Sequence, residues 1–163
     1  MSKSIIIMGV SGCGKTTLGK ALATSLGLPF LEGDAFHSTA NIDKMKSGTP
    51  LNDKDRAPWL LELNKQLIKT KDMGAVLACS ALKESYRDIL SQNITTDELL
   101  WVYLDCSLET LKHRMESRSH FMPLSLLESQ LDTLEIPKKG LHLDATSELN
   151  ELIQQIKSNL DDA

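Results

Sequence analysis

Eight residues near the start of the chain have the types and spacing of a phosphate-binding loop. Residues 9–16 read G-V-S-G-C-G-K-T and fit the pattern G-x-x-x-x-G-K-[ST]. The glycines of such a loop let successive backbone N–H groups turn toward phosphate oxygens, and the following helix N-terminus adds positive potential. Lys15 is predicted to contact the β- and γ-phosphates, Thr16 to bind Mg²⁺ and Thr17 to contact the α-phosphate. The motif therefore predicts a nucleoside triphosphate site, lined also by Gly9, Val10, Ser11, Gly12, Cys13 and Gly14.

Two carboxylates form a second group with chemical potential. Glu32 and Asp34 are separated by one residue, so in an extended segment their side chains lie on one face, which points toward the phosphate loop if the two strands are close. One carboxylate could hold water around Mg²⁺ while the other accepts a hydrogen bond, and then a proton, from an attacking hydroxyl. The alternative is a solvated pair of acids at a strand end.

Cationic side chains in the middle of the chain suggest anion binding. The guanidinium of Arg56 could hold an anionic substrate, or it could only pair with neighbouring acids at the surface. Ser80, Lys83 and Arg87 follow a predicted strand and enter a helix, which places them near one cleft. Lys83 and Arg87 are one helical turn apart, so both could face one anion.

A further basic set lies in the last third of the chain. Arg114 and Arg118 are four residues apart and precede His120. As lid arginines the two would neutralise charge that develops on the γ-phosphate during transfer. The alternative is a solvated helix face in which they pair with Glu116 or other nearby acids.

Apolar runs predict the strands that must position these groups. Strands are expected at residues 5–8, 30–34, 75–79, 99–104 and 141–143. Leucines at helical spacing predict helices after the phosphate loop, around 60–67, around 108–115 and at 149–160, and Asn52 or Asp55 could cap the second of these, with Pro58 in its first turn. This alternation predicts an α/β fold with a five-stranded parallel sheet flanked by helices and ligands at the carboxyl ends of the strands.

Length and composition limit the classes of protein. The 163 residues suit a single domain over 1–163. Its irregular stretches, about 35–57 and 117–123, are candidates for a substrate-binding insert and a lid that with its flanks covers about 114–130. The alternative is that both stretches are solvated connections. No apolar stretch approaches the ~20 residues of a membrane span, and a net charge of −4 argues against a nucleic-acid partner.

Three cysteines, Cys13, Cys79 and Cys106, show no C-x-x-C spacing, which argues against a disulfide framework and a structural zinc site. Cys13, near a helix N-terminus, is alternatively a reactive thiol. The apolar run at the N-terminus is too short for a signal peptide and leads directly into the phosphate loop, so we expect a cytoplasmic protein.

Together these motifs resemble the gluconokinases of the phosphate-loop type. The resemblance covers almost the whole chain and rests on residues 8–16, E-G-D with His37, N-I-D-K-M (41–45), 50–60, C-S-A-L-K (79–83), Y-R-D (86–88), H-F-M-P (120–123), S-Q-L (129–131) and Leu134-Glu135. It implies a P-loop kinase fold with a small lid, and ATP-dependent phosphorylation of D-gluconate at its 6-hydroxyl. It also implies ATP and Mg²⁺ as cofactors and a cytoplasmic homodimer.

The resemblance also implies roles for particular residues. Asp34 is the expected general base, by similarity also to shikimate kinases, and Arg118 the expected lid arginine, with Arg114 behind it. Lys15, Asp34 and Arg118 are thus the predicted catalytic residues, and Thr16 and Glu32 the predicted metal site. The side chains expected to bind the acceptor are Asp34, His37, Arg56, Ser80, Lys83, Arg87 and His120.

Two departures from the family pattern affect these assignments. Only Ser119 separates Arg118 from His120, where the family commonly has a further glycine. Cys79 and Ser80 stand at the end of the third strand, where many phosphate-loop enzymes place a metal-shell aspartate, so that duty passes to Glu32 or Asp34.

Two other functions compete with this interpretation. One is a kinase for another polyol acid or for shikimate, although the insert at 41–60 argues against shikimate. The other is a nucleotide-dependent binding module without phosphoryl transfer. Lys15, Thr16, Asp34 and Arg118 argue against the module, because a binding protein needs no acid beside the γ-phosphate.

Overall fold

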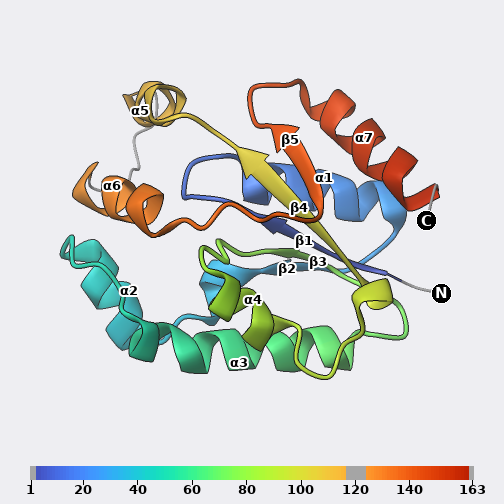
Figure 1. Ribbon diagram of the computed structural model, residues 1–163, viewed down its shortest axis with the longest axis horizontal. Helices are drawn as coiled ribbons and strands as arrows, with labels where there is room; N and C mark the ends of the chain where they lie inside the picture. The colour runs from blue at the N-terminus through green and yellow to red at the C-terminus, as the bar shows by residue number, and fades with distance from the viewer. Residues whose placement is uncertain (1–2, 117–123, 162–163) are drawn as a thin grey trace.

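Five parallel strands form the centre of the molecule (Figure 1). The computed structural model describes residues 3–116 and 124–161. The strands follow the order β2-β3-β1-β4-β5, with β1 at Ser4–Met8, β2 at Phe30–Glu32, β3 at Val76–Ala78, β4 at Leu99–Asp105 and β5 at Leu141–Asp144. The predicted five-stranded parallel sheet is therefore confirmed. Strand β2 does not lie beside β1, because β3 pairs with both.

Helices cover the sheet on both faces, as the alternation predicts. Helices α1 (Lys15–Leu26) and α7 (Leu149–Asp161) pack together, as do α3 (Asp53–Lys69) and α4 (Glu84–Leu90), and Figure 1 shows the two pairs on opposite sides of the sheet. The leucine stripe of α3 is fully buried, with Leu60 and Leu63 at 0% exposure. Each such side chain contributes about 1.5–3 kcal/mol when it leaves water.

Helix α3 begins with a capping box. The Asn52 side chain accepts a hydrogen bond from the Asp55 backbone, and the Asp55 carboxylate accepts one from the Asn52 backbone. Asn52 is thus the cap, as one of the two alternatives predicted. Pro58 lies inside the helix and not in its first turn, so the expectation for its position is wrong.

The stretch at 35–57 is more regular than its composition suggests. A 3₁₀ turn, η1 (Gly33–Phe36), leads to the short helix α2 (Thr39–Lys46), and the Ser38 side chain caps α2 by accepting from the Asn41 N–H. Helix α2 has almost no apolar stripe, so hydrophobic periodicity could not predict it. Helix α6 (Leu124–Thr133) was likewise not predicted.

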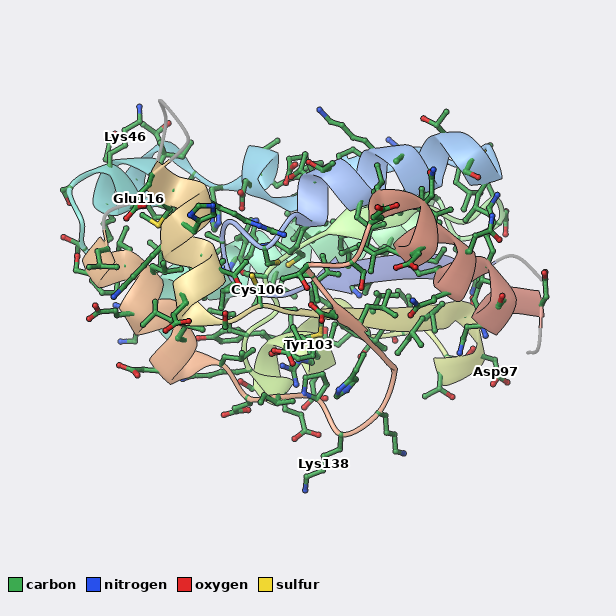
Figure 2. The ribbon with its side chains drawn as sticks, turned by 90° about the horizontal axis from the view of Figure 1, so that it is seen from above. Lys46, Asp97, Tyr103, Cys106, Glu116 and Lys138 are labelled. Atoms are coloured by element: carbon green, nitrogen blue, oxygen red, sulfur yellow. The ribbon has the colours of Figure 1, made fainter. Side chains whose placement is uncertain are left out.

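The remaining elements place α5 (Leu108–Glu116) and α6 near the carboxyl ends of the strands. Figure 2 shows Lys46 at the end of α2 and Glu116 at the end of α5 at one end of the molecule, and Asp97 in the 3₁₀ turn η2 (Thr96–Glu98) at the other. The predicted lid at 117–123 lies outside the described residues. Among the residues that the structure describes, no helix has the length and apolarity that a membrane span requires.

Candidate active site

The phosphate loop joins β1 to α1 through glycines that other residues could not replace. Gly9 has φ of +147°, and a Cβ there would lie 2.8 Å from the Cys13 sulfur and 3.0 Å from the Leu104 carbonyl oxygen. Gly14, directly before α1, has a left-handed φ of +102°. The Lys15 ammonium group donates to the carbonyl oxygens of Gly9 and Val10, each at 3.0 Å. Lys15 is therefore held over the loop with which it is expected to bind phosphate.

Two helices hold the phosphate loop from outside. Arg114 of α5 donates through Nη1 to the carbonyl oxygens of Gly12 (3.3 Å) and Cys13 (2.9 Å) and through Nη2 to Ala145 (2.7 Å). Gln130 of α6 accepts from the Ser11 N–H at 2.8 Å and donates to the Ser11 hydroxyl at 3.1 Å. Arg114 thus lies against the loop backbone, and Gln130 is a contact that the residue pattern did not indicate.

The acids Glu32 and Asp34, at the end of β2 and just after it, occupy different positions. The Thr16 hydroxyl donates to the Glu32 carboxylate at 2.5 Å, which brings the two predicted metal ligands together. Strand β2 ends at Glu32, so Asp34 belongs to η1 and does not share a strand face with Glu32. The expected alternation was wrong for Asp34, yet the turn still directs this residue to the cavity that Lys15 lines.

Gly33, between the two acids, lets this turn lie directly on β3. A Cβ at Gly33 would lie 2.4 Å from the Ala78 carbonyl oxygen and 3.3 Å from the Cys79 Cα. The Gly33 carbonyl accepts a hydrogen bond of 2.7 Å from the buried indole N–H of Trp59. Backbone packing on one side and α3 on the other therefore fix the position of Asp34.

A cavity of about 620 Å³ joins the loop to the insert. On one side it is lined by Ser11, Gly12 and Lys15 of the phosphate loop. Four other residues that the sequence predicts for the acceptor also line it, namely Asp34, His37, Arg56 and Ser80. Its apolar wall includes Trp59, Met115, Leu126 and Leu127. The cavity has the mixed lining typical of small-molecule sites, with a few polar groups on an apolar surface.

His37 packs flat against Trp59 inside this cavity. The ring centroids are 4.0 Å apart and the planes differ by 19°. Burial lowers the pKa of His37, Asp34 opposes this shift and Arg56 adds to it. The imidazole is therefore neutral near pH 7.

Arg56 is oriented by a tyrosine. Its Nη1 donates to the Tyr86 hydroxyl at 3.0 Å, and that hydroxyl donates to the Asp53 carboxylate at 2.5 Å. Burial and the bond to Asp53 raise the pKa of Tyr86, and the same bond, with that from Lys83, lowers the pKa of Asp53. Arg56 thus presents its charge to the cavity from a fixed position.

Lys83 and Arg87 do not face one anion, and that expectation is wrong. Lys83 precedes α4, pairs with Asp53 at 3.3 Å and lines a neighbouring pocket of about 560 Å³. Arg87 donates to the carbonyl oxygens of Ala81 (3.0 Å), Leu82 (3.2 Å) and Glu135. Its guanidinium therefore ties the loop after β3 to the segment after α6 and lines neither pocket.

Sequence reasoning missed four residues of the site. Trp59, Asn41, Tyr86 and Gln130 all lie inside segments that carry the family resemblance, but residue type alone does not reveal their partners. Arg118 and His120 lie outside the described residues. All three cysteines are buried free thiols. Burial of Cys13 argues against the alternative that it is a reactive thiol. Burial also raises the pKa of Cys79 to about 12.

Comparison with known proteins gives a consistent result. The model of the shikimate kinase family matches residues 11–156. A gluconokinase from Gluconobacter oxydans (strain 621H) is 51% identical over 136 residues, covering 82% of this chain and 75% of that protein. The thermosensitive gluconokinase of Escherichia coli (strain K12) is 46% identical over 140 residues, covering 83% and 73%. The crystal structure of a gluconokinase from Sinorhizobium meliloti 1021 superposes with a TM-score of 0.85 at 42% identity, covering 97% and 95%.

Proposed function

The chain belongs to the shikimate kinase family and, within it, to the gluconokinases, and from this premise we propose how its residues transfer the γ-phosphoryl group of ATP to the 6-hydroxyl of D-gluconate. The products are 6-phospho-D-gluconate and ADP. One observation carries the assignment of roles: Lys15 of the phosphate loop lines the same cavity as Asp34, His37 and Arg56. The γ-phosphate of ATP and the acceptor can therefore meet in one cavity.

On the nucleotide side, the loop N–H groups and Lys15 bind the phosphates. Lys15 exchanges its two carbonyl contacts, at Gly9 and Val10, for β- and γ-phosphate oxygens. Ser11 and Gly12 line the cavity beside Lys15, which supports a γ-phosphate position at the boundary with the acceptor side. Arg114 supports the loop from behind, and Arg118 is our proposed lid arginine.

Thr16 and Glu32 are the proposed Mg²⁺ site. The Thr16 hydroxyl donates a hydrogen bond to Glu32, which leaves lone pairs of the hydroxyl oxygen available to a cation beside a carboxylate. One or two such groups suit Mg²⁺, which takes its remaining ligands from water and phosphate oxygens. When bound, the ion neutralises charge on the phosphates.

On the acceptor side, Asp34 is the proposed proton acceptor. The 6-hydroxyl oxygen forms a bond to the γ-phosphorus while its proton passes to the Asp34 carboxylate, and the bridging oxygen leaves with ADP. Arg56, oriented by Tyr86, binds the carboxylate of gluconate, and His37 and Ser80 contact its hydroxyls. Lys83, in the neighbouring pocket, adds positive charge near Arg56.

We also propose a cytoplasmic homodimer. Three buried free cysteines support a reducing compartment, and the family resemblance supports the dimer. Sedimentation equilibrium of the purified protein tests the dimer, because the mass at micromolar concentration is either one or two chains.

A coupled ADP-release assay tests the proposed function. The protein is incubated with ATP, Mg²⁺ and D-gluconate, other aldonates or shikimate, and substrate-free ATP hydrolysis is subtracted. We expect turnover with gluconate and little with the other acceptors. Preferential turnover of another aldonate or of shikimate would overturn the acceptor assignment, and failure to turn over any acceptor would overturn the catalytic roles.

A further inference from the structure

The imidazole of His37 faces a hydrogen-bond donor. Its Nδ1 lies 3.3 Å from the side-chain nitrogen Nδ2 of Asn41, four residues later in α2. An amide nitrogen donates and has no free lone pair to accept. The contact is therefore a hydrogen bond only if Nδ1 carries no proton.

The orientation of the Asn41 amide is fixed independently of His37. Asn41 is 5% exposed, and its Nδ2 also donates to the Asp55 carbonyl oxygen at 2.9 Å. A flipped amide would place oxygen against oxygen at that contact. The two N–H bonds of Nδ2 are thus directed to Asp55 and to His37. The ion pair of Lys44 with Asp55, at 2.7 Å, keeps α2 against the start of α3.

We propose that Asn41 fixes His37 as a neutral imidazole protonated on Nε2, so that His37 serves the acceptor as a hydrogen-bond donor and not as a base. This inference rests on the proposed function, because it assigns a role to His37 within the same gluconate site. Among the described residues, Nε2 has no protein partner, and His37 lines the cavity. Asn41 is thus a positioning residue that acts through His37.

The charges around His37 favour the same state. Burial of the ring lowers its pKa, and the Arg56 guanidinium acts in the same direction. Asp34 favours the protonated ring but is outweighed. Trp59 covers one ring face and brings no charge. Protonation would also place an N–H of the ring against the N–H of Asn41, which adds to the cost.

The proposal divides the work between two neighbouring residues. Asp34 is left as the proton acceptor in the cavity, because the only lone pair of the His37 ring points at Asn41. The His37 Nε2–H can then hold a gluconate oxygen without competing for the proton of the reacting hydroxyl. A site built to donate to a hydroxyl also rejects acceptors that lack one there.

The protonation state can be read directly in the protein without substrate. In ¹⁵N-histidine-labelled protein, long-range ¹H–¹⁵N correlation spectra separate pyridine-like from pyrrole-like ring nitrogens. His37→Gln identifies the signals of His37 among the four histidines. At pH 7 we expect a pyridine-like Nδ1 and a pyrrole-like Nε2. A pyrrole-like Nδ1, or an imidazolium, would overturn the proposal even if gluconate is phosphorylated. Absence of gluconate turnover with the expected spectrum would instead overturn the proposed function alone.

Substitution of Asn41 tests its positioning role. In Asn41→Asp the carboxylate accepts from Nδ1, so the neutral ring moves its proton to Nδ1 and the protonated ring is favoured. Below the raised pKa of His37 the ring still donates through Nε2, and above that pKa it does not. We therefore expect the gluconate KM of Asn41→Asp, relative to wild type, to rise about 3- to 10-fold with increasing pH, with a smaller change in kcat. In Asn41→Ala the neutral ring can still carry its proton on Nε2, so any rise in the gluconate KM should not depend on pH.

The His37→Gln background separates a positioning role of Asn41 from structural damage caused by its substitution. His37→Gln retains an amide donor near the position of Nε2 and does not titrate, so it should lose less gluconate affinity than His37→Phe, which keeps only the ring stacked on Trp59. In the His37→Gln background, Asn41→Asp should lose its pH-dependent effect on KM. If that effect persists, or if His37→Phe binds gluconate as well as His37→Gln does, Asn41 does not act through His37. Thermal unfolding of each variant confirms that it is folded.

Discussion

At the scale of single residues, the proposed acceptor side combines an acid, Asp34, proposed for proton transfer with a cation, Arg56, proposed for recognition. Asp34 comes from a turn held against β3 and α3, and Arg56 comes from the first turns of α3. Each side chain faces the cavity from its own element, so their contributions to turnover and to binding can be measured separately.

Replacing Asp34 with Asn should remove proton acceptance while preserving size. We expect kcat to fall by about 10²- to 10⁴-fold, which is the usual contribution of a general base. The affinity for ATP should change little, because Asp34 belongs to neither the phosphate loop nor its supports. Steady-state kinetics and calorimetric ATP binding measure the two effects, and unchanged kcat would remove Asp34 from the mechanism.

Replacing Arg56 with Ala should chiefly weaken gluconate binding. A charge-assisted hydrogen bond contributes about 1.5–3 kcal/mol, so we expect the gluconate KM to rise at least about 10-fold. Tyr86→Phe is the matched variant, because it removes the hydroxyl that orients Arg56 and keeps the ring under the guanidinium, 5.3 Å away. It should raise KM less. A rise in the KM for ATP instead would move Arg56 to the nucleotide side.

At the scale of elements, short turns and helices set the positions that the sequence pattern could not. The P-loop and the contact of Thr16 with Glu32 follow from residue types, and the cap of α3 was narrowed to Asn52 or Asp55, of which the structure selects Asn52. The bonds of Arg87 to Glu135 and of Gln130 to Ser11 were not predictable, because these partners lie 48 and 119 residues away in the chain. Helix α2 was missed because its stability comes from the Ser38 cap and contacts to α3, and not from an apolar stripe.

The turn η1 should not tolerate a side chain at Gly33. In Gly33→Ala the new methyl group would lie 2.4 Å from a backbone oxygen of β3, so the turn must move. We expect a loss of about 1–3 kcal/mol in the free energy of unfolding and a lower kcat, because Asp34 moves with the turn. Gly27→Ala is the control: it has open space and only the strain of φ +69°, so its loss of stability should leave kcat unchanged. Urea unfolding and kinetics of both variants compare them.

The contact of α6 with the phosphate loop should affect nucleotide binding. Gln130→Glu can still accept from the Ser11 N–H, but it places a negative charge beside the phosphates and can no longer donate to the Ser11 hydroxyl, which must itself donate to the carboxylate. We expect the KM for MgATP to rise at least about 5-fold. The neutral Gln130→Ala should raise it less. Wild-type nucleotide affinity in both variants would show that the contact has no part in binding.

At the scale of the whole molecule, the sheet follows from the sequence more completely than the site does. Continuous apolar runs such as Ile5–Ile7, fully buried in β1, indicate parallel strands covered on both faces. The order of the strands is a different matter, because nothing in the apolar pattern indicates that β3 lies between β1 and β2. The position of β3 between β1 and β2 therefore had to come from the structure.

The buried Cys79 should make folding sensitive to alkali. Burial raises the pKa of this thiol from its ordinary value of 9.0 to about 12 in the folded protein. The thiolate forms more easily in the unfolded chain, so this contribution to stability is complete below pH 9 and is lost as pH rises toward 12. We expect the free energy of unfolding to fall by up to about 1.4 kcal/mol per pH unit in this range. Urea unfolding of Cys79→Ala beside wild type should show a shallower decline, and an equal slope would contradict this contribution.

The cavity also has a consequence for how kinases of this kind can diverge. Most of the polar side chains proposed to contact the acceptor (Asp34, His37 and Arg56) come from one continuous stretch of 34–59, with Ser80 as the exception, while the phosphate loop and its supports come from other parts of the chain. Exchange of this one gene segment by recombination would therefore alter most of the polar acceptor-facing wall and leave the residues of the phosphate loop unchanged.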